Sequence, residues 1–136
     1  MSGPTGTLAG AIVARLRADA AVVAALHGAR VHDRLPRDLA PPWVALDEIR
    51  STDASGLDAP LTRHRLTLRA QTRAEPRDTL AALADAVAAA LDNASLALDG
   101  RRLVLLRVTD VETRVLKDRV TAEAVLRLAA ITEPAA

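Results

Sequence analysis

The sequence predicts an α+β fold in which a mostly antiparallel sheet of about four to five strands is covered by two helices. Two stretches carry apolar residues at helical spacing, and several others alternate apolar and polar residues as strands do. These elements follow the order helix, strand, strand, strand, helix, strand, strand. The chain has 136 residues, the size of one domain, so residues 1–136 are expected to form a single domain.

The first predicted element is an amphipathic helix near the N-terminus. Leu8, Ile12 and Leu16 fall four residues apart, on one face of a helix. Thr5 or Thr7 is the expected N-cap, because a hydroxyl oxygen can accept a hydrogen bond from a free amide of the first turn. This helix should cover one part of the sheet.

A break in this helix is expected at Asp19, which can cap a second, shorter helical piece, AAVVAALHG. Gly28 is the expected end of that piece. The stretch ARVHDRLP then predicts a short extended segment that stops at Pro36. Residues 42–49, PWVALDEI, alternate enough to predict the next strand.

Residues 51–60, STDASGLDAP, are polar and predict a mobile loop. The following stretch, residues 63–76, is RHRLTLRAQTRAEP, and its middle predicts an amphipathic strand. Small and apolar side chains are expected on one face and polar ones on the other, namely Leu66, Leu68 and Ala70 against Arg65, Thr67 and Arg69.

A second helix should begin near Pro76 and close at Asn93 or just after it. Its apolar face comprises Leu80, Leu83, Ala84, Val87 and Leu91. Asp99 and Gly100 then predict a turn, and residues 102–115 predict a long strand. Residues 120–132, VTAEAVLRLAAIT, are ambiguous, because alanine and glutamate favour helix whereas valine, leucine and isoleucine favour a hairpin partner. We predict a strand.

The composition limits the possible functions. The 18 basic and 17 acidic residues nearly cancel, so any basic patch must be local. The absence of cysteine excludes disulfides, thiolate metal sites and cysteine nucleophiles. Trp43 is the only aromatic residue, and we expect subunit association to supply part of the stability. No signal peptide or membrane span is recognisable, so a soluble protein is expected that stays where it is made or leaves inside an assembly.

The sequence offers no pattern typical of an active site, a cofactor site or a metal site. His27, His32 and His64 lack the spacing of a zinc site, and the N-terminal glycines do not form a phosphate-binding loop. Asp110 and Glu112 share one strand face, where a solvated or arginine-paired edge is the simpler interpretation. We therefore predict that the protein is not an enzyme and has no catalytic, cofactor-binding or metal-ligating residues.

The arginines of residues 63–76 are the candidate functional residues. Arg63, Arg65 and Arg69 share one face of the strand, and Arg73 lies just beyond. Such a row could track nucleic acid, but the chain lacks the aromatic residues that stack on bases in single-strand and RNA modules. A salt-bridged sheet face and a subunit interface are the alternatives.

Several longer stretches resemble a known protein family. They are ADAAVVAALHGARVHDRLP, PPWVALDE, LTLRAQTRAEPRDTLAALADAVAAAL, LDGRRLVLLRVTD and LRLAAITEP. In this order they resemble the tail terminator, or tail-completion, proteins of long-tailed bacteriophages, prophages and gene transfer agents. The resemblance extends over residues 8–134, and it rests on patterns of side chains rather than on catalytic signatures.

Individual segments match successive elements of that family, namely residues 19–26, 31–36, 42–46, 66–71 and 128–132, together with Arg77 and the helix through Leu91. Trp43 stands where the family more often has tyrosine or histidine. The hairpin at residues 115–120 lacks the usual glycine.

The resemblance implies a structural protein that forms a six-membered ring on the head-facing end of the tail tube. The ring would stop tube polymerisation and join the tail to the neck, with DNA passing through it without sequence-specific binding. The implied partners are further copies of the chain, the tail tube protein and a neck or stopper protein, with no membrane. The implied location is the bacterial cytoplasm during assembly and then the tail of a released particle.

Arg63, Arg65, Arg69 and Arg73 could meet carboxylates such as Asp110 and Glu112 on a neighbouring subunit. Charge reversal at Arg65 and Arg69 together is expected to weaken ring formation and leave the fold intact. Two other functions stay open, a neck or stopper protein one position nearer the capsid and a small arginine-faced RNA-binding module.

Overall fold

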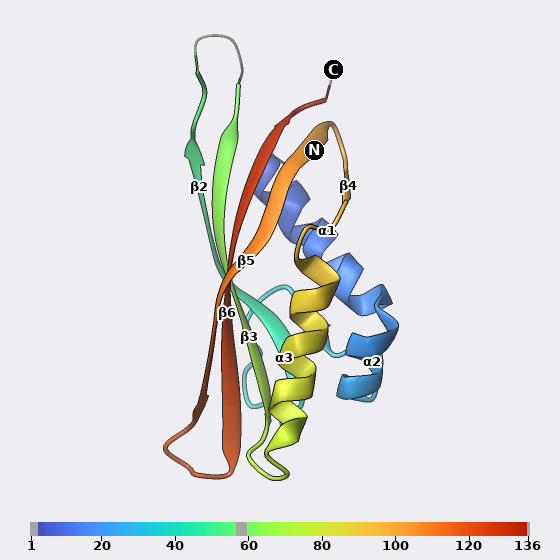
Figure 1. The fold of residues 1–136 in the computed structure, drawn as a ribbon, viewed down its shortest axis with the longest axis vertical. Coiled ribbons are helices and arrows are strands. Elements are labelled where there is room, and N and C mark those ends of the chain that lie inside the picture. Colours follow the sequence, from blue (N-terminus) through green and yellow to red (C-terminus); the bar gives the residue numbers. More distant parts are fainter. Residues whose placement is uncertain (1–2, 57–59, 136) are drawn as a thin grey trace.

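The computed structural model describes residues 3–56 and 60–135. Three helices lie on one face of a curled six-stranded sheet, in which the strands are ordered β1-β2-β3-β6-β5-β4 (Figure 1). The α+β class and the covered, mostly antiparallel sheet are confirmed. The number of strands is six rather than four to five.

The predicted break in the first helix is confirmed. It separates α1 (Pro4–Ala18) from α2 (Ala20–Leu26), and the Asp19 side chain accepts a hydrogen bond of 3.0 Å from the Val22 amide. The predicted N-cap of α1 was wrong, because Gly3 is the N-cap and Pro4 opens the helix, where its fixed φ suits the first turn.

The third helix, α3 (Asp78–Leu91), follows Pro76 as predicted. Its predicted apolar face is buried, and Asn93 follows the helix with a left-handed φ of 58°. At the end of α2 the left-handed residue is His27, at φ 57°, and Gly28 comes next.

The six strands are β1 (Val31–His32), β2 (Trp43–Asp53), β3 (Thr62–Arg73), β4 (Ala97–Leu98), β5 (Arg101–Val115) and β6 (Thr121–Pro134). β1 is parallel to β2, and every other pairing is antiparallel. The prediction missed β4, because two residues carry no alternation. The predicted turn at Asp99 and Gly100 joins β4 to β5, with Gly100 at a left-handed φ of 67°.

The predicted loop at residues 51–60 was partly wrong. β2 continues to Asp53, which pairs with Thr62 at the start of β3. The polar composition of these residues indicated a loop, but a ladder needs only backbone groups, and a strand beyond the helices can carry polar side chains. Residues 57–59 of the predicted loop lie outside the described residues.

The choice of strand for residues 120–132 is confirmed. β6 pairs with β3 along one edge and with β5 along the other, so it occupies the middle of the sheet. Its backbone groups can bond on both sides only as a strand, which outweighs the helical preference of its alanines.

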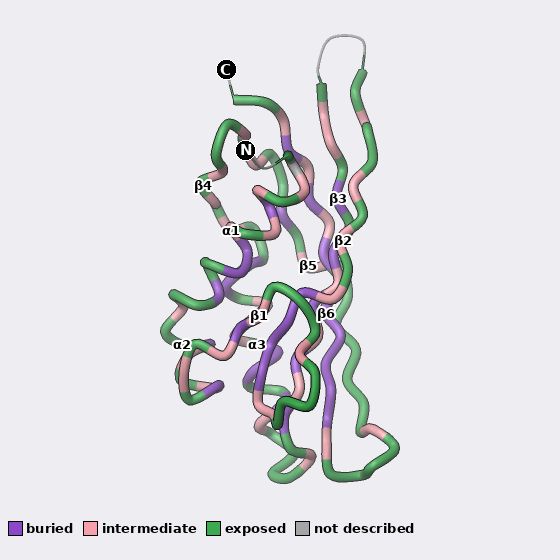
Figure 2. Tube along the Cα trace, turned by 180° about the vertical axis from the view of Figure 1, so that it is seen from behind, coloured by how far each residue is buried: buried purple, intermediate pink, exposed green. Residues whose placement is uncertain are grey.

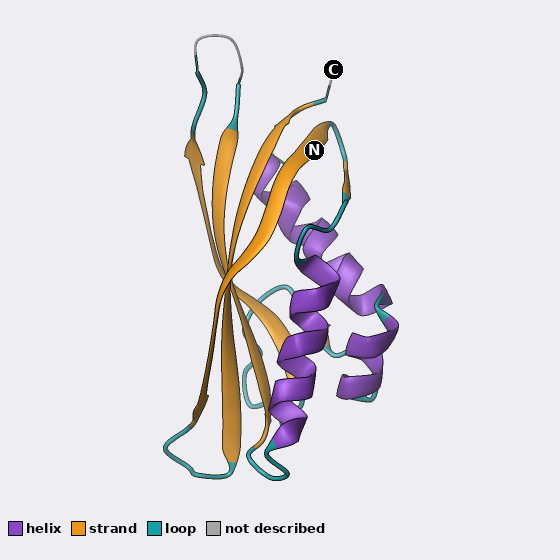
Figure 3. Ribbon diagram, viewed as in Figure 1, coloured by secondary structure: helices purple, strands orange, loops and turns teal. Residues whose placement is uncertain are grey.

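The core lies between the helices and one face of the sheet (Figures 2 and 3). Leu66 and Leu68 of β3 face Leu128 and Leu126 of β6, and all four are at most 2% exposed. Small residues lie beside them, which permits close approach of the helices. The buried alanines of this core are Ala70, Ala84, Ala90, Ala122, Ala124 and Ala130.

Among the described residues, no helix lies on the opposite face of the sheet (Figure 3). The segment after β1 shields one end of it, where Trp43 is 5% exposed and its Nε1 donates to the Leu39 carbonyl at 3.2 Å. We call the face away from the helices the open face.

Candidate functional site

The four predicted arginines of β3 all lie on the open face. Their side chains alternate along the strand with buried residues that face the helices, His64, Leu66, Leu68, Ala70 and Thr72. The amphipathic strand that the sequence predicted is therefore confirmed, and Arg73 belongs to it as its last residue.

Arg69 differs from the other three because it is held by carboxylates of its own chain. Its Nε donates to Asp47 at 2.6 Å and its Nη1 to Glu123 at 2.7 Å. Asp47 is the extra residue of a β-bulge between Leu46 and Glu48. The hydrogen bond to Asp47, followed by the charges of Glu123 and Asp47, raises the pKa of Arg69 although burial opposes this. Charge reversal at Arg69 would therefore disturb the fold, contrary to our expectation for the double reversal.

Glu123 is the centre of this ion-pair cluster. It is 4% exposed, and it also accepts hydrogen bonds of 2.8 Å each from Gln71 and Arg114. Burial acts to raise the pKa of Glu123, but the hydrogen bonds from Gln71 and Arg114 and the charges of Arg69 and Arg114 together lower it. This end of the open face is thus internally compensated.

Asp110 and Glu112 also lie on the open face, but within the chain they do not meet the arginines of β3. Both approach Arg127 of β6, whose Nη1 lies 2.5 Å from Asp110 and whose Nη2 lies 3.5 Å from Glu112. More than half of each carboxylate side chain is exposed, so both remain accessible to another molecule.

The other end of the open face is basic and unpaired. Arg50, Arg63 and Arg65 line a hollow of about 240 Å³, and a neighbouring hollow of about 640 Å³ extends toward β6. No described carboxylate forms a hydrogen bond or an ion pair with these three side chains. The sequence prediction missed Arg50, because only the pairing of β2 with β3 places it directly opposite Arg65.

His64 takes part in a buried chain of side-chain hydrogen bonds. Its Nδ1 lies 2.8 Å from the Ser51 hydroxyl, its Nε2 lies 2.9 Å from the Thr132 hydroxyl, and Ser51 accepts a hydrogen bond from Thr5. Burial, and secondarily the charge of Arg101, lowers the pKa of His64. The neutral imidazole thus joins α1 to three strands.

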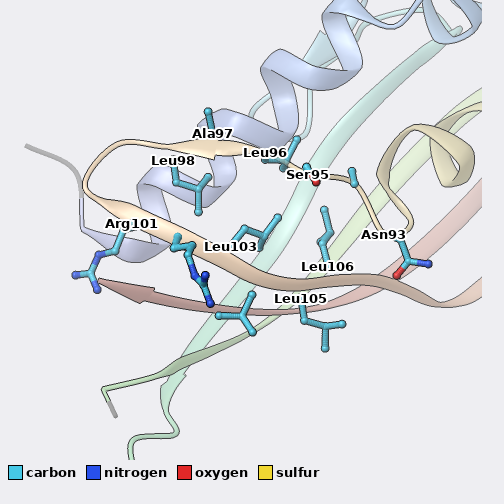
Figure 4. Close-up of a pocket in the computed structure, with 12 residues that line it drawn as sticks. Asn93, Ser95, Leu96, Ala97, Leu98, Arg101, Leu103, Leu105 and Leu106 are labelled. Carbon is cyan, nitrogen blue, oxygen red and sulfur yellow. The ribbon is translucent and has the colours of Figure 1, made fainter. Parts of the chain in front are cut away.

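A third hollow, of about 370 Å³, lies between residues 93–98 and β5 (Figure 4). Leucines and alanines dominate its lining, with Arg101 and Arg102 at one end, and no carboxylate or imidazole takes part. Residues 3–56 and 60–135 contain no group of three or more histidines and carboxylates that could hold a metal ion. None of the helices in these residues is long and apolar enough to cross a membrane.

The fold and its surface define a small α+β protein that packs three helices against one face of a curled sheet and presents charged side chains on the other. The chain belongs to the family of tail completion protein gp17, whose model matches residues 10–133. This confirms the resemblance to tail-completion proteins that the sequence indicated.

The chain is also similar to a solved structure described as "Virion of native gene transfer agent (GTA) particle". The two chains are 32% identical and superpose with a TM-score of 0.84, over 97% of this chain and 99% of the other. A search of the curated proteins found no match.

Proposed function

We propose that this protein completes the tail of a phage-like particle by forming a ring on the head-facing end of the tail tube. The ring stops tube polymerisation and offers a docking surface to the neck. The match of residues 10–133 to the tail completion family carries this proposal. A similar chain from a gene transfer agent virion supports it.

In this proposal the partners are further copies of the chain, the tail tube protein and a neck or stopper protein. Six copies would close the ring, with DNA passing through the centre without sequence-specific contacts. A cyclic ring uses head-to-tail interfaces, so each subunit needs two different complementary surfaces. The protein would act first in the bacterial cytoplasm and then within the released particle.

Tail length in a deletion strain tests the proposal. Without a terminator, electron micrographs should show tails of irregular length that lack heads, and the gene supplied in trans should restore uniform length. Tails of normal length beside unattached heads that leak DNA would instead identify a neck or stopper protein.

We propose that the subunit interface uses the charged side chains of the open face, namely Arg63, Arg65 and Arg73 with Asp110 and Glu112, to which the geometry adds Arg50. The ion pairs of Arg69 assign that residue a role in the fold. The Arg65→Glu variant should melt like the wild-type protein but give fewer rings. Arg37→Glu, at an exposed arginine of the segment after β1, is the matched control and should assemble normally.

The RNA-binding alternative predicts tight binding of oligonucleotides at low salt that weakens steeply as salt rises. We expect no such binding, because the basic end of the open face holds only a few arginines and no aromatic residue. Oligonucleotide binding by the purified protein in low salt, with normal tails in the deletion strain, would favour the RNA-binding function.

A further inference from the structure

The sheet has two outer edges, and each is only partly covered. β1 pairs with the Trp43 end of β2, and β4 pairs with the Arg101 end of β5. Residues 48–53 of β2 and residues 109–115 of β5 have no backbone hydrogen bond on their outer side from any described residue. A free strand edge is a template for pairing with another strand.

We infer that the free edge of β5 in one copy pairs antiparallel with the free edge of β2 in the next copy, which specifies the interface of the proposed ring and rests on that proposal. The two edges lie on opposite sides of the sheet and near opposite ends (Figure 1). One copy therefore offers both halves of a head-to-tail contact, and the pairing can repeat from subunit to subunit.

The backbone groups of both edges are oriented for this pairing. On β2, the Val44 amide points outward and donates to the Arg30 carbonyl at 3.0 Å. On β5, the Leu106 carbonyl points outward and accepts from the Asn93 amide at 2.9 Å. Val44 and Leu106 both turn their side chains into the core. In both strands, then, the residues that face the helices have outward backbone groups.

By the same relation, outward backbone groups are expected at Val111 and Thr113 on β5 and at Ile49 and Ser51 on β2. The residues that pair with these four within the chain turn their side chains toward the helices. An antiparallel ladder sets outward residues against outward residues. Val111 thus faces Ser51 of the next copy and Thr113 faces its Ile49, or the register shifts by an even number of residues. The open faces of the two copies then become continuous.

The charges of the open face select one register. With Val111 opposite Ser51 of the next copy, Glu112 lies opposite Arg50 and Arg114 lies opposite Glu48. A shift of two residues in one direction would set Arg114 against Arg50. A shift in the other direction would set Glu112 against Glu48 and Asp110 against Arg50, so that one like-charge pair would offset one opposite-charge pair. Opposite charges on directly facing residues stabilise a strand pair, and like charges destabilise it.

Apolar side chains at the edge of β5 favour the same contact. Val111 is 45% exposed and Val115 is 59% exposed, on the helix side of the sheet beyond the cover of α3. A neighbouring strand carrying Ile49 would reduce both exposures. The pairing therefore places matched charges on the open face of the contact and apolar side chains on its helix side.

The register also sets the step between subunits. Within one copy Val111 is level with Leu46, which pairs with Leu68, whereas Ser51 pairs with His64 farther along β3. The offset between copies is thus about four residues, or about 13 Å. The four long strands of one copy are together about 19 Å wide. The offset divided by this width corresponds to a slope of about 35°, which is near the tilt of strands in closed barrels. The offset is therefore compatible with closure of the ring.

A cysteine pair tests the register. Asp110→Cys on one edge and Thr52→Cys on the other should face each other on the open face as a non-hydrogen-bonded pair, with Cα atoms about 4.5 Å apart, within disulfide range. The chain has no cysteine of its own. Mild oxidation of the assembled double variant should give a ladder of covalent oligomers on a non-reducing gel. The control pair, Asp110→Cys with Glu48→Cys, lies out of reach and should stay monomeric.

A charge exchange tests the selection of that register. Arg50→Glu and Glu112→Arg should each raise the protein concentration needed for half-assembly by about tenfold or more. The double variant restores the pair with exchanged charges and should return to within about threefold of the wild type. A double variant as defective as the sum of its single changes would contradict the pairing of these residues.

The outcomes separate this interface from the proposed function. Rings in micrographs without the covalent ladder of the Asp110→Cys and Thr52→Cys variant would overturn the edge pairing and leave the tail-completion proposal standing. If neither the purified protein nor purified particles contain rings, the proposed function fails and the edge pairing fails with it. Rings with the ladder, and none from the control pair, support both.

Discussion

Glu123 is the most sensitive side chain of the open face, and the variant Glu123→Gln tests its role. The carboxylate is 4% exposed and accepts hydrogen bonds from Arg69, Gln71 and Arg114. Arg69 and Arg114 both donate to Oε1 and Gln71 donates to Oε2, so the amide can keep its oxygen toward the two arginines, but without the negative charge, and its amino group then faces the Gln71 donor. Two hydrogen bonds to charged groups, at about 1.5–3 kcal/mol each, set the upper bound for the loss in free energy of unfolding.

The expected cost is below that bound, for two reasons visible in the structure. Arg69 keeps its hydrogen bond of 2.6 Å to Asp47. The Arg114 side chain is 58% exposed and can return to water. We therefore expect Glu123→Gln to lower the free energy of unfolding by about 2 kcal/mol. At about 2.1 cal/mol/K per residue, 136 residues unfold with about 0.29 kcal/mol/K, so Tm should fall by about 7 °C.

Urea unfolding at pH 7 measures this loss. Trp43 is the only tryptophan, and it lines a hollow on the open face together with Glu123 and Arg69. Its fluorescence therefore reports this region, while far-UV circular dichroism follows the whole fold. The matched control is Glu133→Gln, which breaks the exposed pair with Arg102 and should cost less than about 0.5 kcal/mol. Equal losses in the two variants would refute the idea that Glu123 holds the face together.

Three further predictions concern stability. The folded state binds a proton at His64 less tightly than the unfolded chain does, since burial and the charge of Arg101 lower the pKa of His64. The stability that depends on the neutral imidazole should therefore be complete above about pH 6.5 and should fall as the pH drops below it. A His64→Asn variant that loses the same stability in acid would contradict this. Arg119 has a left-handed φ of 63°, so Arg119→Gly should stabilise the hairpin by about 0.5 kcal/mol, and a lower urea midpoint would contradict that. Asp19→Ala removes the hydrogen bond to the Val22 amide and should lower the free energy of unfolding, measured in urea, by about 1 kcal/mol. An unchanged free energy of unfolding would contradict a stabilising role of this cap.

The arginines of β3 illustrate how far the sequence predicts the candidate site. Alternation alone placed Arg63, Arg65 and Arg69 on one face, and the structure agrees. Nothing in the local pattern separates Arg65 from Arg69, yet Arg69 is tied to Asp47 and Glu123 while Arg65 is unpaired. The difference arises from a bulge in β2 and from the position of β6, both of which depend on pairing across the sheet.

By itself the sequence determined most of the local elements and their apolar faces, because helical spacing and alternation are properties of neighbouring residues. It determined the capped break at Asp19, the turn at Gly100 and the family resemblance for the same reason. Only the tertiary structure decided the register of the strands, and with it the partners of each charge and the two uncovered edges. Those features depend on residues far apart in the chain, whose distances only the folded backbone sets.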